Sequence, residues 1–226
     1  MVAKVTVRRN FRGQSPEERQ ERRRRSLVEA ALHLVHSDGL QATSVRSVCA
    51  RAGLTSRYFY ESFQNLEELL SAALEETADE LLGAGVEAIR DAQDQAREVR
   101  LRKGMDASVG VLLRDPRRAA LMAALGAGDP RLQRERRVMV MRVAAAIQSE
   151  PEAWEFGGIQ ATALYVAGGL VELTLAYLDG ELALSRDQLV DHLVSLTLGA
   201  IGSADARALT GGSQRRAMPV LLQDRS

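Results

Sequence analysis

The sequence has little cysteine and few aromatic residues. Cys49 is the one cysteine among 226 residues, which excludes an internal disulfide framework and predicts a reducing compartment. Cys49 falls on the apolar face of an expected helix, where a thiol behaves as a small buried hydrophobe; a redox switch is the alternative. Aromatic residues make up 4% of the chain, so an aromatic cage around a cationic ligand is disfavoured.

Net charge is also absent, since 30 basic residues balance 30 acidic ones. Taken alone, this balance argues against a nucleic-acid partner. The distribution is uneven, however: residues 1–63 hold 12 Lys and Arg against 6 Asp and Glu, and the rest holds 18 against 24. A basic N-terminal segment on an acidic body is typical of a DNA-binding unit attached to a body that does not bind DNA.

Several functional patterns are missing from the sequence. It has no strand-like alternation, phosphate-binding glycine loop, paired acid and base, or cluster of metal ligands. We therefore expect a protein that is not an enzyme and that binds no metal or cofactor. An enzyme acting on a small apolar substrate is the weakest alternative. The first residues lack the apolar run of a signal peptide, which predicts a cytoplasmic protein. Residues 159–178 are long and apolar enough to span a membrane, but Gln160 and Glu172 interrupt them without a basic flank, so we expect no membrane contact.

Residues 43–63 have the pattern of two short helices joined by a tight turn. We expect Thr43 to be the N-cap of the first helix, whose apolar face carries Val48 and Cys49. Gly53 tolerates the left-handed backbone that a tight turn needs. A second helix over residues 56–62 follows, capped by Thr55 or Ser56. This is the pattern of a helix-turn-helix, whose second helix enters the DNA major groove.

The second helix of this motif carries the candidate DNA-reading side chains. Phe59 and Phe63 are four residues apart and should face the core, which leaves Arg57 and Tyr58 to contact bases. Arginine can bond guanine O6 and N7 together, a contact worth about 1–3 kcal/mol of discrimination. Core packing at the interface between the two domains is the alternative for the tyrosines. The predicted DNA contacts are Arg8, Arg9, Arg12, Thr43, Ser44, Arg46, Thr55, Ser56, Arg57, Tyr58 and Tyr60.

The segment before the motif is basic. Residues 1–14 form a flexible basic arm, for which contact with phosphates or the minor groove competes with a solvated tail. Ser15, Pro16 and Glu18 form a helix start with a capping box, and the helix should run to about Ser37. Arginines 22–25 are either a solvated charge run or the source of one or two phosphate contacts.

The remaining chain is expected to be helical. Asn65 caps a long helix with a one-sided apolar stripe to Leu81, and Gly83-Ala84-Gly85 is expected to break it. Residues 83–104 should be helical but charge-rich, and further helices should cover residues 105–114, 116–125, 131–149, 159–178 and 186–201. The last two are apolar enough to form half of a four-helix dimer interface, with plain internal core as the alternative. The predicted fold is all-α: a helix-turn-helix domain over 15–64, a helical ligand-binding and dimerisation domain over 65–203, and a disordered tail over 204–226.

The residues A-G-L-T-S-R-Y-F-Y-E-S-F resemble the signature of TetR-type (tetracycline-repressor-like) regulators. The likeness covers about residues 22–70, and Ser62 and Leu66 depart from the family's frequent His and Lys, which usually touch phosphate. The arginines would then supply backbone contacts. The matching positions are Gly39, Thr43, Val45, Val48, Ala52, Gly53, Leu54, Thr55, Phe59, Tyr60, Phe63 and Leu69.

This resemblance implies a homodimeric transcriptional regulator bound to double-stranded DNA at a near-palindromic site, with recognition helices about 34–36 Å apart. It implies dimerisation through the last two long helices, a phosphate contact from Tyr60, and a repressor released by a small-molecule effector. A ligand-independent DNA-binding or architectural protein is the alternative. We expect a mostly apolar ligand, because the composition is aliphatic, and Glu172 either to face it or to pair with an arginine. Candidate ligand residues are Met105, Val109, Met122, Trp154, Phe156, Tyr165, Glu172 and Tyr177.

Overall fold

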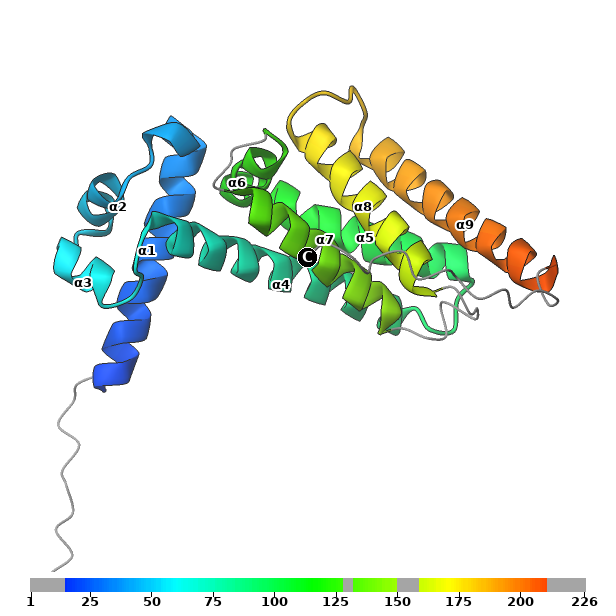
Figure 1. Cartoon of the computed structure of the whole chain (residues 1–226), viewed down its shortest axis with the longest axis horizontal. Helices are drawn as coiled ribbons and strands as arrows, with labels where there is room; N and C mark the ends of the chain where they lie inside the picture. The colour runs from blue at the N-terminus through cyan, green and yellow to red at the C-terminus, as the bar shows by residue number, and fades with distance from the viewer. Residues whose placement is uncertain (1–14, 128–131, 150–158, 211–226) are drawn as a thin grey trace, which may run out of the picture.

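A computed structural model describes residues 15–127, 132–149 and 159–210. These residues form helices joined by short turns, without a strand, so the predicted all-α fold is confirmed. The N-terminal group consists of α1 (Pro16–Asp38), the short 3-10 helix η1 (Leu40–Ala42), α2 (Val45–Ala52) and α3 (Ser56–Tyr60). Figure 1 shows α4 (Leu66–Asp91) leaving this group and entering a helical bundle. The bundle contains α5 (Arg97–Arg114), α6 (Pro116–Gly126), α7 (Gln133–Gln148), α8 (Ile159–Leu178) and α9 (Arg186–Thr210).

Local capping signals explain where most N-terminal helices begin. The capping box of Ser15 and Glu18 is present at α1, and the Asn65 side chain accepts a hydrogen bond from the Glu68 amide at 2.8 Å. The prediction of Thr43 as the cap of α2 is wrong. Ser44 is the cap, in a reciprocal pair with Ser47. Thr43 is buried, and its hydroxyl donates to the Gly39 carbonyl at 3.0 Å, so it holds the turn that precedes α2.

The predicted helix break at residues 83–85 is also wrong, because α4 continues to Asp91 and the chain turns at residues 92–96. Gly85 allows α4 to approach α5 closely: a Cβ built there would lie 2.4 Å from Ser108 Oγ. A Cβ on Gly104, in the facing part of α5, would lie 2.6 Å from Ile89 Cγ1 and 3.1 Å from the Gly85 carbonyl oxygen. These two glycines therefore serve helix packing.

The close approach of α4 and α5 makes a testable prediction. Gly104→Ala should lower the free energy of unfolding, because overpacking costs about 1–3 kcal/mol and the higher helix propensity of alanine returns only about 1 kcal/mol. Gly83→Ala is the matched control, since a Cβ at that exposed position of α4 meets nothing within 4 Å. Gly83→Ala should raise the free energy of unfolding by up to about 1 kcal/mol. Urea unfolding at one protein concentration measures both, and shifts of the same sign would contradict the close packing.

The apolar core is continuous from α1–α3 into the bundle. One cluster includes Leu27 of α1, Phe59 of α3, Leu70 of α4, Leu121 of α6 and Leu175 of α8, each fully buried. A second cluster joins α5 to α9. Because buried side chains connect the two parts, a shift of α4 or α6 inside the bundle is transmitted to α1–α3 by packing.

The last two helices differ in part from expectation. By length and composition α8 could cross a membrane, but it packs beside α7 and α9 in the bundle (Figure 1). Helix α9 extends to Thr210, so residues 204–210 are helical and the predicted tail begins too early. The arm over residues 1–14 and the rest of the predicted tail, residues 211–226, lie outside the described residues.

Candidate nucleic-acid interface and buried cavity

The short helix α3 is held by its aromatic residues. Phe59 and Phe63 are buried, as predicted, with ring centroids 6.0 Å apart. Gly53 adopts the left-handed backbone at the end of α2, with φ of 65°, and Thr55 begins α3 without a side-chain cap. With Phe59 facing inward, the other side of α3 is open: Arg57 is 84% exposed, Tyr60 61% and Tyr58 38%.

Most of the predicted DNA-contacting side chains in the described residues are exposed. Ser44 is the N-cap of α2, and Arg46 lies in the first turn of that helix. Thr55 and Ser56 precede Arg57 at the start of α3. Thr43 is the exception, because its hydroxyl is buried and bonded to the backbone. Arg8, Arg9 and Arg12 lie outside the described residues.

The arginine run of α1 is divided between packing and exposure. The Arg23 guanidinium lies over the Tyr58 ring, 4.7 Å from its centroid, and 3.7 Å from the Glu61 carboxylate. Glu61 also accepts a 3.1 Å hydrogen bond from Arg57 Nε. Arg24 pairs with Glu76 of α4 at 2.8 Å. Arg23 and Arg24 therefore fasten α1 to α3 and α4, which the sequence reading of the four arginines as one block did not predict.

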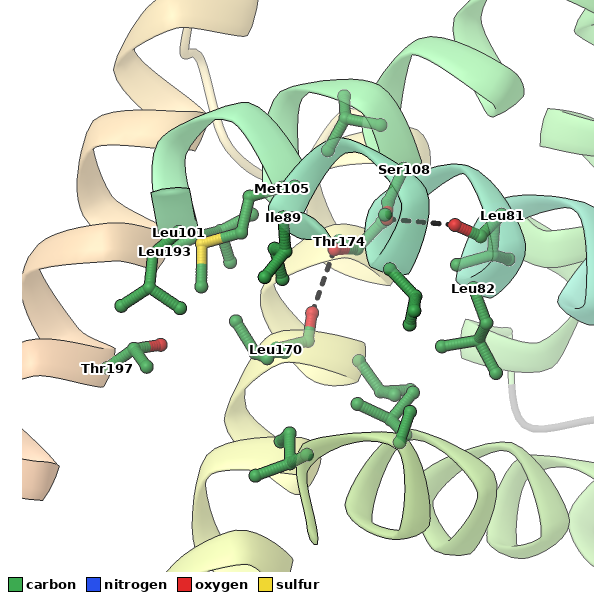
Figure 2. A pocket seen from close by; sticks show the side chains of 18 of the residues that line it. Leu81, Leu82, Ile89, Leu101, Met105, Ser108, Leu170, Thr174, Leu193 and Thr197 are labelled. Carbon is green, nitrogen blue, oxygen red and sulfur yellow. Dashed lines mark hydrogen bonds between the residues drawn. The ribbon is translucent and has the colours of Figure 1, made fainter. Parts of the chain in front are cut away.

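A cavity of about 170 Å³ lies among α4, α5, α6, α7, α8 and α9. Figure 2 shows its mostly aliphatic lining, which includes Leu81 and Ile89 of α4, Leu101 and Met105 of α5, and Leu170 of α8. The hydroxyl of Ser108 donates to the Leu81 carbonyl at 2.9 Å, and that of Thr174 donates to the Leu170 carbonyl at 2.8 Å. These two hydroxyl protons are used by the backbone, and Thr197 of α9 adds a third hydroxyl to a lining that is otherwise mostly aliphatic in this part of the cavity.

The predicted ligand residues are divided among several places. Met105, Val109 and Met122 line the cavity. Tyr177 packs instead against the cluster that joins α5 and α9, and Trp154 and Phe156 lie outside the described residues.

Two further candidates are placed on the surface, against the expectation of a buried ligand contact. Tyr165 is 76% exposed, and Glu172 is 60% exposed and paired with Arg136 of α7.

Sequence reasoning missed the cavity residues of α4 and the start of α5. Val86 and Ile89 follow the supposed break at residues 83–85, and Arg97 and Arg100 stand in a stretch that looks merely charge-rich. The sequence did contain a signal that these residues share one helix face, namely spacing at i, i+3, i+4, i+7 and i+8. The residues with this spacing are Arg97, Arg100, Leu101, Gly104 and Met105.

A polar network ties α6 to the N-terminal helices. Arg117 reaches Glu29 of α1 at 2.6 Å and Asp115 at 2.7 Å, and Arg118 reaches Glu80 of α4 at 2.8 Å. The hydrogen bond from the Arg117 side chain holds the pKa of Asp115 below its usual value. Asp115 also caps α6 by accepting from the Arg117 amide at 3.0 Å. One end of α6 is therefore fastened to both α1 and α4.

An exposed apolar face lies between α8 and α9. Leu164 and Tyr165 on α8 and Leu196 on α9 are large exposed hydrophobic residues, and they border a shallow surface hollow with Gly168 and Gly169. Large exposed apolar patches of this kind mark interaction sites.

The fold and the exposed helix-turn-helix define a class of protein, the helix-turn-helix transcription regulators that bind DNA. The family model described as "Bacterial regulatory proteins, tetR family" matches residues 27–73, from the middle of α1 into α4. The match shows that residues 27–73 carry the DNA-binding domain of TetR-family transcriptional regulators, and the described residues share the all-α fold of solved structures of that family.

Solved structures share this fold. A TetR-family transcriptional regulator from Streptomyces coelicolor has a TM-score of 0.63 at 20% identity, covering 85% of this chain and 86% of its own. A putative regulator of the family from Syntrophomonas wolfei has a TM-score of 0.63 at 13% identity, over 80% and 96% of the two chains. The TetR family repressor AlkX from Dietzia sp. has a TM-score of 0.56 at 19% identity, over 79% and 97%. The comparison with curated proteins gave no significant match.

Proposed function

We propose that this protein is a cytoplasmic homodimeric repressor, released from a near-palindromic operator by a small, mostly apolar ligand. The observation that carries the proposal is the apolar cavity, since α4 lines it with Leu81 and Ile89 and then runs directly to the DNA-binding helices. In this proposal, residues 15–64 form the DNA-binding domain and residues 65–203 the ligand-binding and dimerisation domain.

The dimer would form through α8 and α9. Their exposed face combines large apolar side chains such as Leu164 and Leu196 with the small residues Gly168 and Gly169. Glycines on this face let a helix of the second copy approach closely, and a two-fold axis places the same patch against itself. Such a dimer presents two copies of α3 to successive turns of the DNA.

Release would work through α4 and α6. A ligand that fills the cavity presses on α4, and α6 contributes Met122 to the same lining. Because Arg117 of α6 holds Glu29 of α1, a shift of α6 changes the position of α1 and hence the spacing of the two recognition helices. A typical coupling free energy for such a switch is about 1–3 kcal/mol.

A ligand-independent DNA-binding protein is the second candidate. It requires little unoccupied volume in the bundle, and the cavity of about 170 Å³ favours ligand control instead.

The test is fluorescence anisotropy with the intergenic DNA upstream of the protein's own gene, a scrambled duplex of equal length and two salt concentrations. Binding to the upstream DNA that outlasts the salt increase supports sequence reading, because purely electrostatic binding falls steeply with salt. Equal, salt-sensitive binding to both duplexes would count against a specific operator there.

Arg57→Ala should weaken binding to the operator about 10-fold or more and relax base preference, because a lost bidentate contact to guanine costs about 1–3 kcal/mol. The melting temperature should stay nearly constant, since this side chain is exposed and pairs only with Glu61 in the described residues. Arg90→Ala, an exposed arginine near the end of α4, is the control and should bind as the unmodified protein does. An equal loss on every DNA sequence would make Arg57 a phosphate contact.

A further inference from the structure

One end of the otherwise apolar cavity is lined by two arginines, Arg97 and Arg100, in the first turn of α5. Both side chains are half-buried. The Nε of Arg100 is buried and has no hydrogen-bond partner. Within residues 15–127, 132–149 and 159–210, neither guanidinium makes an ion pair. Partly buried cations are normally paired, because desolvation of an unpaired charge is costly.

Other half-buried arginines of the bundle do have partners. Arg118 pairs with Glu80 at 2.8 Å, and Arg186 pairs with Asp106 at 2.8 Å. The acidic residues nearest in sequence to the cavity arginines, Asp94 and Glu98, are exposed and pair with neither. No described residue therefore forms an ion pair with Arg97 or Arg100, and both side chains line the cavity.

The positive charge is confined to one end of the cavity. The α5 residues that line it recur along one face from Arg97 to Leu112, a distance of about 22 Å at 1.5 Å per residue. Arg97 and Arg100 stand at the end of the bundle far from α1–α3, where α4 gives way to α5 (Figure 1). Ala96 begins α5 without a side-chain cap, so the free amides of the first turn add to the positive potential.

We propose that the effector is an amphiphile with an anionic head group, in its simplest form a carboxylate, on a medium-length aliphatic chain. The head group binds Arg97 and Arg100, and the chain extends from Leu101 along the apolar lining of α5 toward Leu112. A guanidinium matches a carboxylate with two parallel hydrogen bonds. The inference rests on the proposed function, because it takes the cavity as the effector site.

The size of the cavity limits the chain. A dry apolar cavity of about 150 Å³ holds benzene, and this one is about 170 Å³. A ligand such as octanoate therefore suits the cavity better than a long acyl chain. An uncharged chain leaves both arginines unpaired, and a cationic head group is repelled by them.

Isothermal titration calorimetry on the full chain tests the head group with sodium octanoate, 1-octanol, octylamine and octanoyl-coenzyme A. Octanoate should bind at least about 10-fold more tightly than 1-octanol, because a hydrogen bond to a charged group contributes about 1.5–3 kcal/mol. Octylamine should bind most weakly. If octanoyl-coenzyme A alone among the four binds, and binding requires the arginines, the effector is an acyl thioester and the phosphates of its coenzyme A part are the anionic head group. If 1-octanol binds as tightly as octanoate, the head-group inference is overturned while an apolar ligand site remains.

Arg100→Met locates the binding, since methionine keeps an unbranched stem without the charge. It should lose about 10-fold or more in affinity for octanoate and leave the affinity for 1-octanol unchanged. Its melting temperature without ligand should not fall, because the variant removes an unpaired cation. Arg90→Met, outside the cavity lining, is the matched control. Equal losses in both variants would place octanoate on the surface and overturn the inference.

Fluorescence anisotropy of operator DNA, measured with and without octanoate, distinguishes the head-group inference from the proposed release of DNA. Octanoate that binds through Arg100 and releases the DNA supports both. Octanoate that binds through Arg100 without releasing the DNA supports the head-group inference and contradicts the proposed release.

Discussion

Replacing Gly169 by arginine should convert the dimer into a monomer and remove high-affinity DNA binding. Gly169 is exposed on α8, and a Cβ there meets nothing within 4 Å in the isolated chain. The single chain therefore accommodates the new side chain in solvent. In the proposed dimer the same side chain becomes an unpaired charge inside the interface, at a cost of about 3–5 kcal/mol, and the interface is weakened by at least about 100-fold.

Size-exclusion chromatography with light scattering measures the molar mass and therefore the oligomeric state. Fluorescence anisotropy measures the affinity for operator DNA. DNA affinity should fall with the dimer, since one recognition helix alone makes only half of the contacts. Gly83→Arg is the control, because Gly83 is exposed on α4 and also has nothing within 4 Å. It should remain dimeric. A Gly169→Arg protein with the mass of a dimer would show that α8 is not at the interface.

Removing the Phe59 ring should unfold the DNA-binding helices. Phe59 is fully buried, with its ring centroid 5.4 Å from that of Tyr60 and 6.0 Å from that of Phe63. Phe59→Ala in such a core costs about 3–5 kcal/mol. Helix α3 has five residues, too few to be stable without packing, so the loss should fall on the recognition helix and remove DNA binding.

Hydrogen exchange and urea unfolding measure this loss. Amides of α2 and α3 should lose protection in Phe59→Ala, whereas those of α9 should keep most of theirs, because the buried residues of α9 belong to other core clusters than Phe59. Tyr60→Ala is the control: its side chain is exposed, so it should change stability by less than about 1 kcal/mol. A Phe59→Ala protein that retains operator binding would contradict the role of this ring as the anchor of α3.

The helix-turn-helix was predictable because its determinants are local. Ser15 with Glu18 and Asn65 with Glu68 are within three residues of each other, so their caps depend on the sequence alone. Gly53 marks a left-handed turn by residue type. The spacing of Phe59 and Phe63 places both rings on one side of the chain, and burial of that side exposes Arg57.

In the helical bundle, predictions from residue type alone were less reliable, because one residue type can have several roles inside a helix. Gly85 looked like a helix break, but it lies inside α4, where the absence of a side chain admits Ser108. Glu172 forms the arginine pair that was one of its two predicted alternatives, but the pair with Arg136 lies at the surface and not in the core. A glycine or a carboxylate in a helix has several uses, and only the neighbouring helix selects among them.

The sequence by itself determined the all-α class, the DNA-binding motif and the uneven charge, since periodicity, caps and composition act over a few residues. Tertiary structure decided the cavity and its polarity. Leu81, Arg100 and Leu193 come from three helices, and no local pattern states that they share one space. The packing of α4 on α5 and of α5 on α9 brings them together, because these helices bury their apolar faces against one another.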